Sequence, residues 1–322
     1  MLVVVSIANL ADDSAQPPGT VADATVVSLD DGSSVPSPTT AAPGAGGEPA
    51  TVVTTVDRGT AQATIVIPFT AFGRDANAPE RGANAIAALA DGRIVILDPV
   101  ASRVQVVDAS GGLSTFAELP NPWFSVLVPS PDASMILAIN LGDGLAVDII
   151  SGANYELPDM VQRLSTGLDF VLDEASTLAV RNPSDQHLYS IVTLGPDGST
   201  AAPTASRIDG LRWWNDEKNR LIVQTNDSSE PFAIDVGPNG WGGLRQAQLS
   251  DGRTVLLGVP QDAAHPVLLV IDDRTVTAVS VDPGLDSWNV AFEMAPSIAV
   301  HGTTVTIAGA SPSGLTFTTI KL

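Results

Sequence analysis

The sequence predicts an all-β protein, a six-bladed β-propeller over residues 62–322. Three observations support this prediction: a repeated strand signal, tight turns between apolar strands, and a last repeat that is one strand short. No stretch keeps the 3.6-residue apolar period of a helix over four turns without Pro or Gly, so strands are the expected secondary structure.

The repeated signal is an Asp residue followed within a few positions by a run of aliphatic residues. Its six occurrences begin at Asp91, Asp132, Asp173, Asp216, Asp251 and His301, where His takes the place of Asp. Spacings of about 35–50 residues, built from short strands, are typical of propeller blades. We expect each Asp side chain to accept a hydrogen bond from a backbone N–H in its turn, which is a structural role and not a catalytic one.

Tight turns join the last two strands of each repeat. Residues 108–112, Asp-Ala-Ser-Gly-Gly, separate two strand-like segments, and Ser151-Gly152 does the same in the next repeat. Gly, Asn and Asp tolerate the positive φ angles that hairpin turns need. The pattern therefore indicates four antiparallel strands per repeat, A to D in chain order.

The last repeat ends one strand short, because only residues 315–320 follow its second strand. An unassigned strand, residues 63–69, lies directly before the first complete repeat. Pairing of this strand beside residues 315–320 would complete the sixth blade and cover both exposed strand edges. A seventh blade built from residues 20–60 is the alternative.

One repeat resembles a known family. Residues 86–108, Ile-Ala-Ala-Leu-Ala-Asp-Gly-Arg-Ile-Val-Ile-Leu-Asp-Pro-Val-Ala-Ser-Arg-Val-Gln-Val-Val-Asp, are similar to an NHL-type propeller repeat. In that family an Asp-Gly turn precedes strand B, an Asp follows it, and Arg-Val-Gln-Val begins strand C. The resemblance covers one blade and implies the propeller fold. Propeller lyases and lactonases of related shape carry His or carboxylate metal ligands along the axis, and no such set can be placed in this sequence.

The N-terminal region differs in composition from the rest. Residues 1–11 are apolar, and we interpret them as a signal-peptide remnant or a docked strand. Residues 12–61 are rich in Pro, Gly, Ser, Thr and Ala, which is typical of a linker without a core of its own. Such segments tether proteins to surfaces, so we expect an extracellular or cell-envelope location, and no membrane insertion of the propeller domain.

Charge and composition exclude several functions. The net charge is −21, with 36 acidic and 15 basic residues, so nucleic acid is not an expected partner. With no Cys, the chain has no disulfides, thiolate metal sites or cysteine nucleophiles. We expect no cofactor and no metal held by the scattered residues His187, His265 and His301. Calcium held by loop carboxylates needs no sequence signature and stays an open alternative.

Three functional hypotheses compete, because no catalytic motif is present. The alternative to the leading hypothesis, a binding scaffold, is a propeller-type lyase or hydrolase that uses axial carboxylates as acid and base. Its candidates are Asp75, Glu80, Asp169, Asp209 and Asp286. A third hypothesis is a purely structural module of a larger assembly.

The leading hypothesis is a scaffold that binds a protein or a glycan through one face. In a propeller the D–A and B–C loops share that face, and this chain concentrates Trp and Arg, the residues that dominate binding hot spots, in its D–A segments. The candidate ligand-binding residues are Trp123, Arg163, Arg207, Arg212, Trp213 and Trp288. Trp213 and its neighbour Trp214 point to opposite sides of a strand, so we expect one of them to pack in the core.

Overall fold

The computed structural model describes residues 25–26, 53–56, 61–73, 85–108, 110–164, 169–182, 186–215, 220–226, 229–235, 241–260, 266–273, 275–281, 297–311 and 314–322. Within these ranges the chain is all-β, and its only helical segments are two single 3-10 turns. Its strands form six small sheets, each built around an antiparallel meander. The predicted fold class, a six-bladed β-propeller, is confirmed by this number and pattern of sheets. The chain divides into two compact units, which we describe one at a time.

The first unit is built mainly from residues 67–209 and holds three blades. Their strand orders are β4-β5-β6-β7, β8-β9-β10-β11 and β12-β13-β14-β15, and β16 also pairs with β14. The strands are β4 (Ala85–Ala88), β5 (Ile94–Asp98), β6 (Arg103–Val107), β7 (Leu113–Glu118), β8 (Val126–Pro129), β9 (Ile136–Asn140), β10 (Leu145–Asp148), β11 (Asn154–Glu156), β12 (Phe170–Leu172), β13 (Thr177–Arg181), β14 (Leu188–Leu194), β15 (Thr200–Ala201) and β16 (Arg207–Ile208). The β4–β7 sheet is a complete blade, as the NHL-type resemblance implied.

The second unit holds the other three blades, formed by residues 19–66, 210–289 and 295–322. Their strand orders are β1-β19-β18-β17, β2-β23-β22-β21-β20 and β24-β25-β26-β3. The strands are β1 (Thr25–Val26), β2 (Val53–Val56), β3 (Ala61–Ile67), β17 (Arg212–Asn215), β18 (Leu221–Gln224), β19 (Phe232–Asp235), β20 (Trp241–Gln248), β21 (Thr254–Pro260), β22 (Val267–Asp272), β23 (Thr275–Ser280), β24 (Ser297–His301), β25 (Thr304–Ser311) and β26 (Gly314–Lys321).

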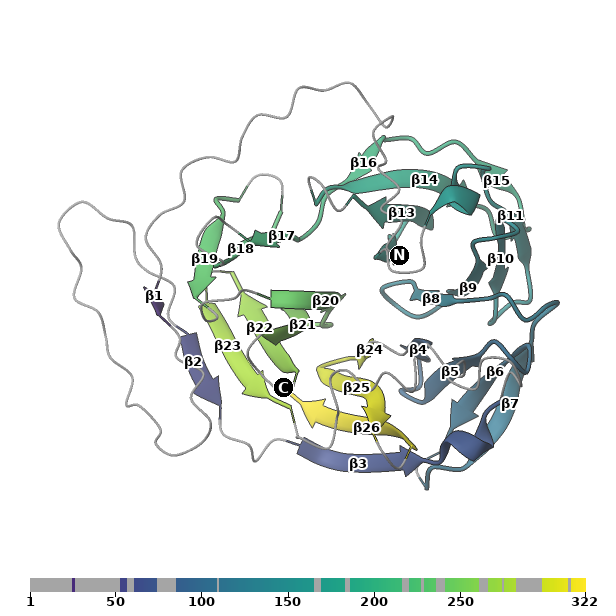
Figure 1. The fold of residues 1–322 in the computed structure, drawn as a ribbon. Helices are drawn as coiled ribbons and strands as arrows, with labels where there is room; N and C mark the ends of the chain where they lie inside the picture. Colours follow the sequence, from purple (N-terminus) through teal and green to yellow (C-terminus); the bar gives the residue numbers. More distant parts are fainter. Residues whose placement is uncertain are drawn as a thin grey trace. The chain divides into compact units, whose positions relative to one another are not determined.

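The last blade is completed by the N-terminal part of the chain. Strand β3 pairs with β26, and Figure 1 shows this early strand, drawn in blue, beside the yellow C-terminal strand. The predicted pairing of residues 63–69 with residues 315–320 is confirmed, and the strand itself spans Ala61–Ile67. The first unit begins at Ile67, the last residue of β3, and after Pro68 the chain makes a 3-10 turn, η2 (Phe69–Ala71).

The segment expected to be a linker, residues 12–61, also supplies two short outer strands. β1 pairs in parallel with β19, and β2 pairs in parallel with β23, with Val53 opposite Val276 and Val56 opposite Val279. Both therefore extend existing blades. Among the described residues of 20–60, no separate seventh blade is formed.

The repeated Asp residues hold the turns before strand B, as predicted. Asp91, Asp132 and Asp251 each accept a hydrogen bond from the backbone N–H two residues later, at 3.0, 3.0 and 3.2 Å. The carboxylate of Asp173 accepts a hydrogen bond from the backbone N–H of Thr177, four residues later, at 2.7 Å. Asp216 lies outside the described residues.

These turn contacts predict an acid-dependent loss of stability. Hydrogen bonds from the backbone and side chain of Ser134, and from the hydroxyl of Ser130, lower the pKa of Asp132 from 3.8 to about 2. Because the carboxyl is more acidic in the folded state, its ionised form stabilises the fold above about pH 4. That contribution disappears as the pH falls from about 4 to about 2. We expect Asp132→Asn to melt below the wild type at pH 6 and close to it at pH 2. Melting curves across this range test the expectation, and a difference that stays constant with pH would contradict it.

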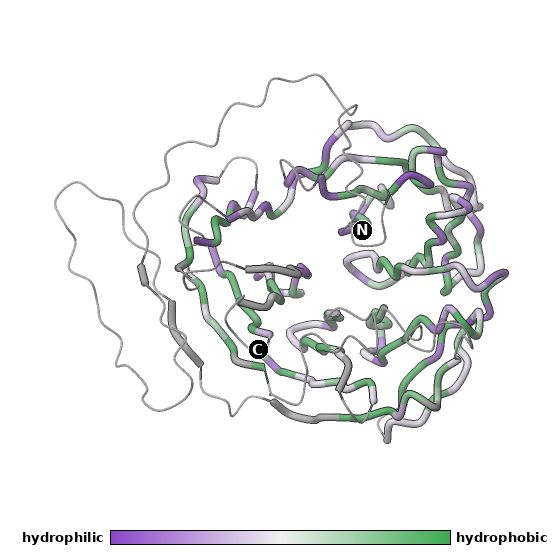
Figure 2. The backbone as a smooth tube through the Cα atoms, viewed as in Figure 1, coloured by the Kyte–Doolittle hydropathy of each residue, from purple (hydrophilic) through white to green (hydrophobic). Residues whose placement is uncertain are grey.

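Hydrophobic residues fill the space between consecutive blades within each unit. In the first unit one cluster joins β4–β6 to β8–β10, and a second joins β8–β11 to β12–β14. In the second unit one cluster joins β17–β19 to β21–β23, and another joins β21–β23 to β25 and β26. Figure 2 shows the hydrophobic colouring concentrated along the strands. Because neighbouring blades cover the faces of a blade, its strands appear in the sequence as continuous apolar runs. The described residues include no helix long and apolar enough to cross a membrane.

Candidate functional site

The B–C loops are organised by a buried polar residue at the end of strand B. This residue occurs in four successive blades and is at most 9% exposed. The four residues are Asp98, Asn140, Arg181 and Gln224. Because a buried polar group needs hydrogen-bond partners, each of them fixes backbone or side chains at the loop end of its blade.

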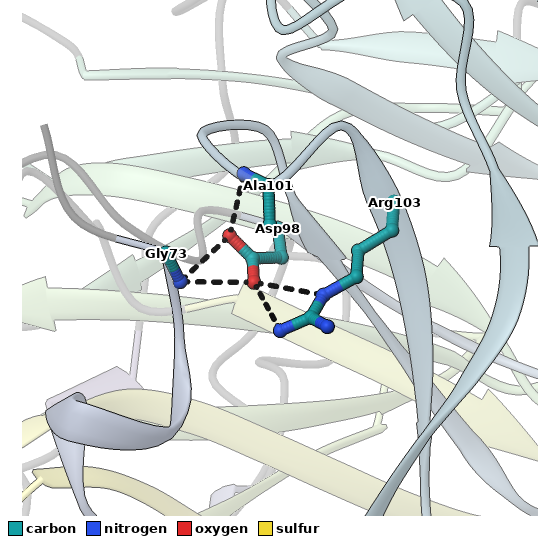
Figure 3. A network of polar contacts seen from close by, with 4 residues as sticks. All are labelled: Gly73, Asp98, Ala101 and Arg103. Atoms are coloured by element: carbon teal, nitrogen blue, oxygen red, sulfur yellow. Dashed lines mark hydrogen bonds and ion pairs between the residues drawn. The ribbon is translucent and has the colours of Figure 1, made fainter.

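Asp98 shows how such a residue works (Figure 3). Its carboxylate accepts hydrogen bonds from the backbone N–H of Gly73 at 3.1 Å and of Ala101 at 3.4 Å, and it pairs with Arg103 at 3.3 Å. Gly73 follows η2 and belongs to the D–A loop that leads into the first complete blade. A Cβ at Gly73 would lie 2.8 Å from the backbone nitrogen of Ala101, so the two loops approach too closely for a side chain there.

In the next blade the corresponding residue, Asn140, builds a network of side chains. Its Nδ2 donates to Asp143 Oδ2 at 2.8 Å and to Asn121 Oδ1 at 3.0 Å. Asn121 Nδ2 donates to the same Asp143 oxygen at 3.1 Å, and the backbone N–H of Asp143 donates to Asn140 Oδ1 at 3.1 Å. The network joins the D–A loop before this blade to its B–C loop.

Trp123 lies on that D–A loop and is 64% exposed. Its backbone N–H donates to Asn121 Oδ1 at 3.1 Å, so the network also holds the segment that carries the ring. The segment reads Leu119-Pro120-Asn121-Pro122-Trp123-Phe124, and its two ends, Leu119 and Phe124, are buried at 7% and 1% exposure. Two prolines restrict the backbone between these anchors. The loop therefore presents a large aromatic ring to solvent on a restrained base.

The next D–A loop, which follows strand β11, also contacts Asp143. It contains the 3-10 turn η3 (Val161–Arg163), in which Val161 is fully buried. Gln162 Nε2 donates to the carbonyl oxygen of Asp143 at 3.5 Å, and its neighbour Arg163 is exposed. Three loops thus meet at Asp143. We call Asn121, Trp123, Asn140, Asp143 and Gln162 the Asp143 loop cluster.

The other predicted ligand-binding residues that the structure describes make contacts of a different kind. Arg207 is in the outer strand β16, where Nη2 donates to the Tyr189 hydroxyl at 3.1 Å and the guanidinium lies 5.0 Å from that ring. Arg212 lies 5.7 Å from the half-buried ring of Trp214, while Trp213 is only 8% exposed and belongs to the core of its unit.

Trp288 lies outside the described residues, and so do three of the proposed axial carboxylates, Asp75, Glu80 and Asp286, and His265. Of the proposed axial carboxylates that are described, Asp169 forms an ion pair with the buried Arg181 at 3.1 Å. Asp209 is exposed. Among the described residues, no group of three or more His, Asp or Glu side chains is placed to hold a metal ion.

The polar ends of strand B, and Asn121, Asp143 and Gln162 of the Asp143 loop cluster, are functional candidates that our sequence reasoning missed, whereas Trp123 was predicted. A signal was present: in these blades the aliphatic run of strand B ends in a polar residue, as in Ile-Leu-Ala-Ile-Asn140. Asn121 had no such signal, because its partners are 19 and 22 residues away in the chain.

Comparison with known proteins supplies only distant structural similarity. No protein-family model matches the chain, and no curated protein matches it. Among solved structures, a streptogramin B lyase is 13% identical, with a TM-score of 0.48, over 80% of this chain and 98% of that one. A calcium-binding protein, regucalcin from Agrobacterium tumefaciens, is 14% identical, with a TM-score of 0.44, over 74% and 90%. A PQQ-bound aldose sugar dehydrogenase from Streptomyces coelicolor is 11% identical, with a TM-score of 0.42, over 80% and 98%.

Proposed function

We propose that this protein is an extracellular or cell-envelope binding scaffold, which holds a protein or a glycan through the face formed by its D–A and B–C loops. The observation that carries the proposal is Trp123, a large aromatic ring 64% exposed on a loop restrained by hydrogen bonds and two prolines. Exposed aromatic side chains on a rigid support contribute most to binding because little conformational entropy is lost when they are covered.

The surroundings of Trp123 support this proposal. The Asp143 loop cluster places amide and carboxylate groups beside the aromatic segment, and Arg163 follows Gln162 on the adjoining loop. A binding site combines apolar area for affinity with a few oriented polar groups for specificity. The composition of residues 12–61 suits a tether that carries such a site away from a surface.

A matched pair of variants tests this function. Trp123→Ala removes the ring at the loop face, whereas Ile150→Ala removes a 43%-exposed apolar side chain from the C–D turn at the other end of strand β10. We expect the wild type and Ile150→Ala to bind the same members of an immobilised glycan array or peptide array. Trp123→Ala should lose that binding while its melting temperature stays within about 2 °C of the wild type, because exposed substitutions change stability by roughly 0.5 kcal/mol or less.

Two outcomes would contradict the proposal. In one, Trp123→Ala binds every array member as well as the wild type does. In the other, both variants lose binding equally, which would place recognition elsewhere on the surface.

A further inference from the structure

Resting on the proposed function, we infer that the Asp143 loop cluster is a subsite for a neutral glycan, in which one pyranose ring stacks on Trp123 and its hydroxyl groups hydrogen-bond to Asp143 and neighbouring amides. The inference deepens the proposed function, which leaves protein and glycan open.

The chemistry of the cluster favours a sugar. A pyranose has an apolar C–H face that covers an aromatic ring, and hydroxyls at its rim that both donate and accept hydrogen bonds. The network that holds the backbone of Trp123 consists of two Asn side chains, one carboxylate and one Gln, all planar polar groups, of which Asn140 is fully buried. Apart from Leu119 and Phe124, which are buried, no large apolar residue of the described segment 119–124 accompanies the indole. A peptide hot spot, in contrast, usually includes a wider apolar area.

Asp143 retains capacity to bind a hydroxyl. Both amide donors of the network go to its Oδ2, and none of the described residues donates to its Oδ1. The residue is exposed, so this oxygen can accept from a ligand. An ionised carboxylate accepts only, and a sugar hydroxyl is a suitable donor for it.

Charge favours a neutral glycan over an acidic one. The carboxylate of Asp143 lies within the cluster, and the chain as a whole carries a net charge of −21. The carboxylate and the net charge would repel a uronate, and the exposed Arg163 next to Gln162 sets only one positive charge against them. The uncharged hydroxyls of a neutral sugar meet no such repulsion. Binding of a neutral ligand should also be nearly independent of salt.

The experiment follows the indole N–H signal of Trp123 by NMR in the full-length protein during titration. The Trp123→Phe variant identifies this signal among those of the five tryptophans. The neutral probes are cellohexaose, xylohexaose, mannohexaose and chitohexaose, and the acidic probe is an oligogalacturonate of the same length. For one aromatic platform we expect dissociation constants of about 0.1–5 mM for at least one neutral hexasaccharide.

Three variants refine the outcome. Because Trp123→Ala and Trp123→Phe lack the Trp123 indole, their binding is followed through the shifts of backbone amide signals in the loops. Trp123→Ala should weaken binding at least tenfold, and Trp123→Phe should lie between it and the wild type because a smaller ring remains. Asp143→Asn keeps one oxygen for the two amide donors but replaces the other acceptor by an NH2 group. We therefore expect about threefold to tenfold weaker binding, with an unchanged melting temperature.

The inference is overturned if no neutral hexasaccharide shifts the Trp123 signal at concentrations up to about 10 mM, or if only the oligogalacturonate does. These failures are separable from failure of the proposed function. Array peptides could bind the wild type but not Trp123→Ala, while no hexasaccharide shifts the Trp123 signal. In that case the proposed binding face would stand, with a protein as its partner.

Discussion

A chain that begins at Phe69 and so lacks β3 is expected to lose its cooperative fold. Strand β3 forms the outer edge of the last blade beside β26, whose Leu315 and Phe317 are at most 3% exposed. Its removal leaves the eight-residue, mostly buried strand β26 with unpaired backbone groups, which favours aggregation. We expect a loss of roughly 5 kcal/mol or more, which is comparable with the whole stability of many domains.

The matched control begins at Ala61, so it lacks β1 and β2 but keeps β3. Those two strands contribute only 2 and 4 residues to the edges of their blades, and this chain should stay soluble and melt cooperatively. Circular dichroism melts and size-exclusion chromatography compare the two chains. Equal melting temperatures would show that β3 does not complete the last blade.

Replacement of Trp213 by Ala is expected to cost about 3–5 kcal/mol, because it removes a large side chain from a packed core. Trp213 is 8% exposed and packs in one cluster with residues such as Leu221, Phe232 and Leu256. For a domain of this size such a loss lowers the melting temperature by roughly 6–20 °C.

Trp214→Ala is the matched control on the same strand. Its ring is half-buried, with the guanidinium of Arg212 5.7 Å from the ring centroid. This contact contributes about 0.5–1 kcal/mol at a partly exposed site, so the effect on melting should be much smaller than that of Trp213→Ala. If Trp213→Ala melts like the wild type, the residue is not part of the core, and a ligand-binding role for it regains support.

The sequence by itself determined most of the architecture. Strand identity follows from short apolar runs, and the turn-forming Asp residues follow from a local side-chain-to-backbone geometry that spans only two to four residues. Completion of the last blade was also predictable, because a repeat lacking one strand and a spare strand can be counted from the sequence. Local periodicity and repeat counting thus sufficed for the fold class.

The candidate site was predicted only in part. Sequence composition selected Trp123 and Arg163, and the structure brings their loops together at Asp143. Composition could not indicate that Trp123 is exposed while Trp213 is buried, because the exposure of each ring depends on the residues that pack against it in the folded chain.

Only the tertiary structure decided which polar groups accompany the exposed ring. Asn121, Asp143 and Gln162 lie on three different loops, about 20 residues apart in the chain, and meet because consecutive blades stack through their cores. Loop side chains follow no fixed period, so their direction depends on non-local hydrogen bonds such as that from Asn140 to Asn121. The physical reason is that a strand's pattern is set by its own backbone, whereas a loop site is set by the packing of the blades that carry it.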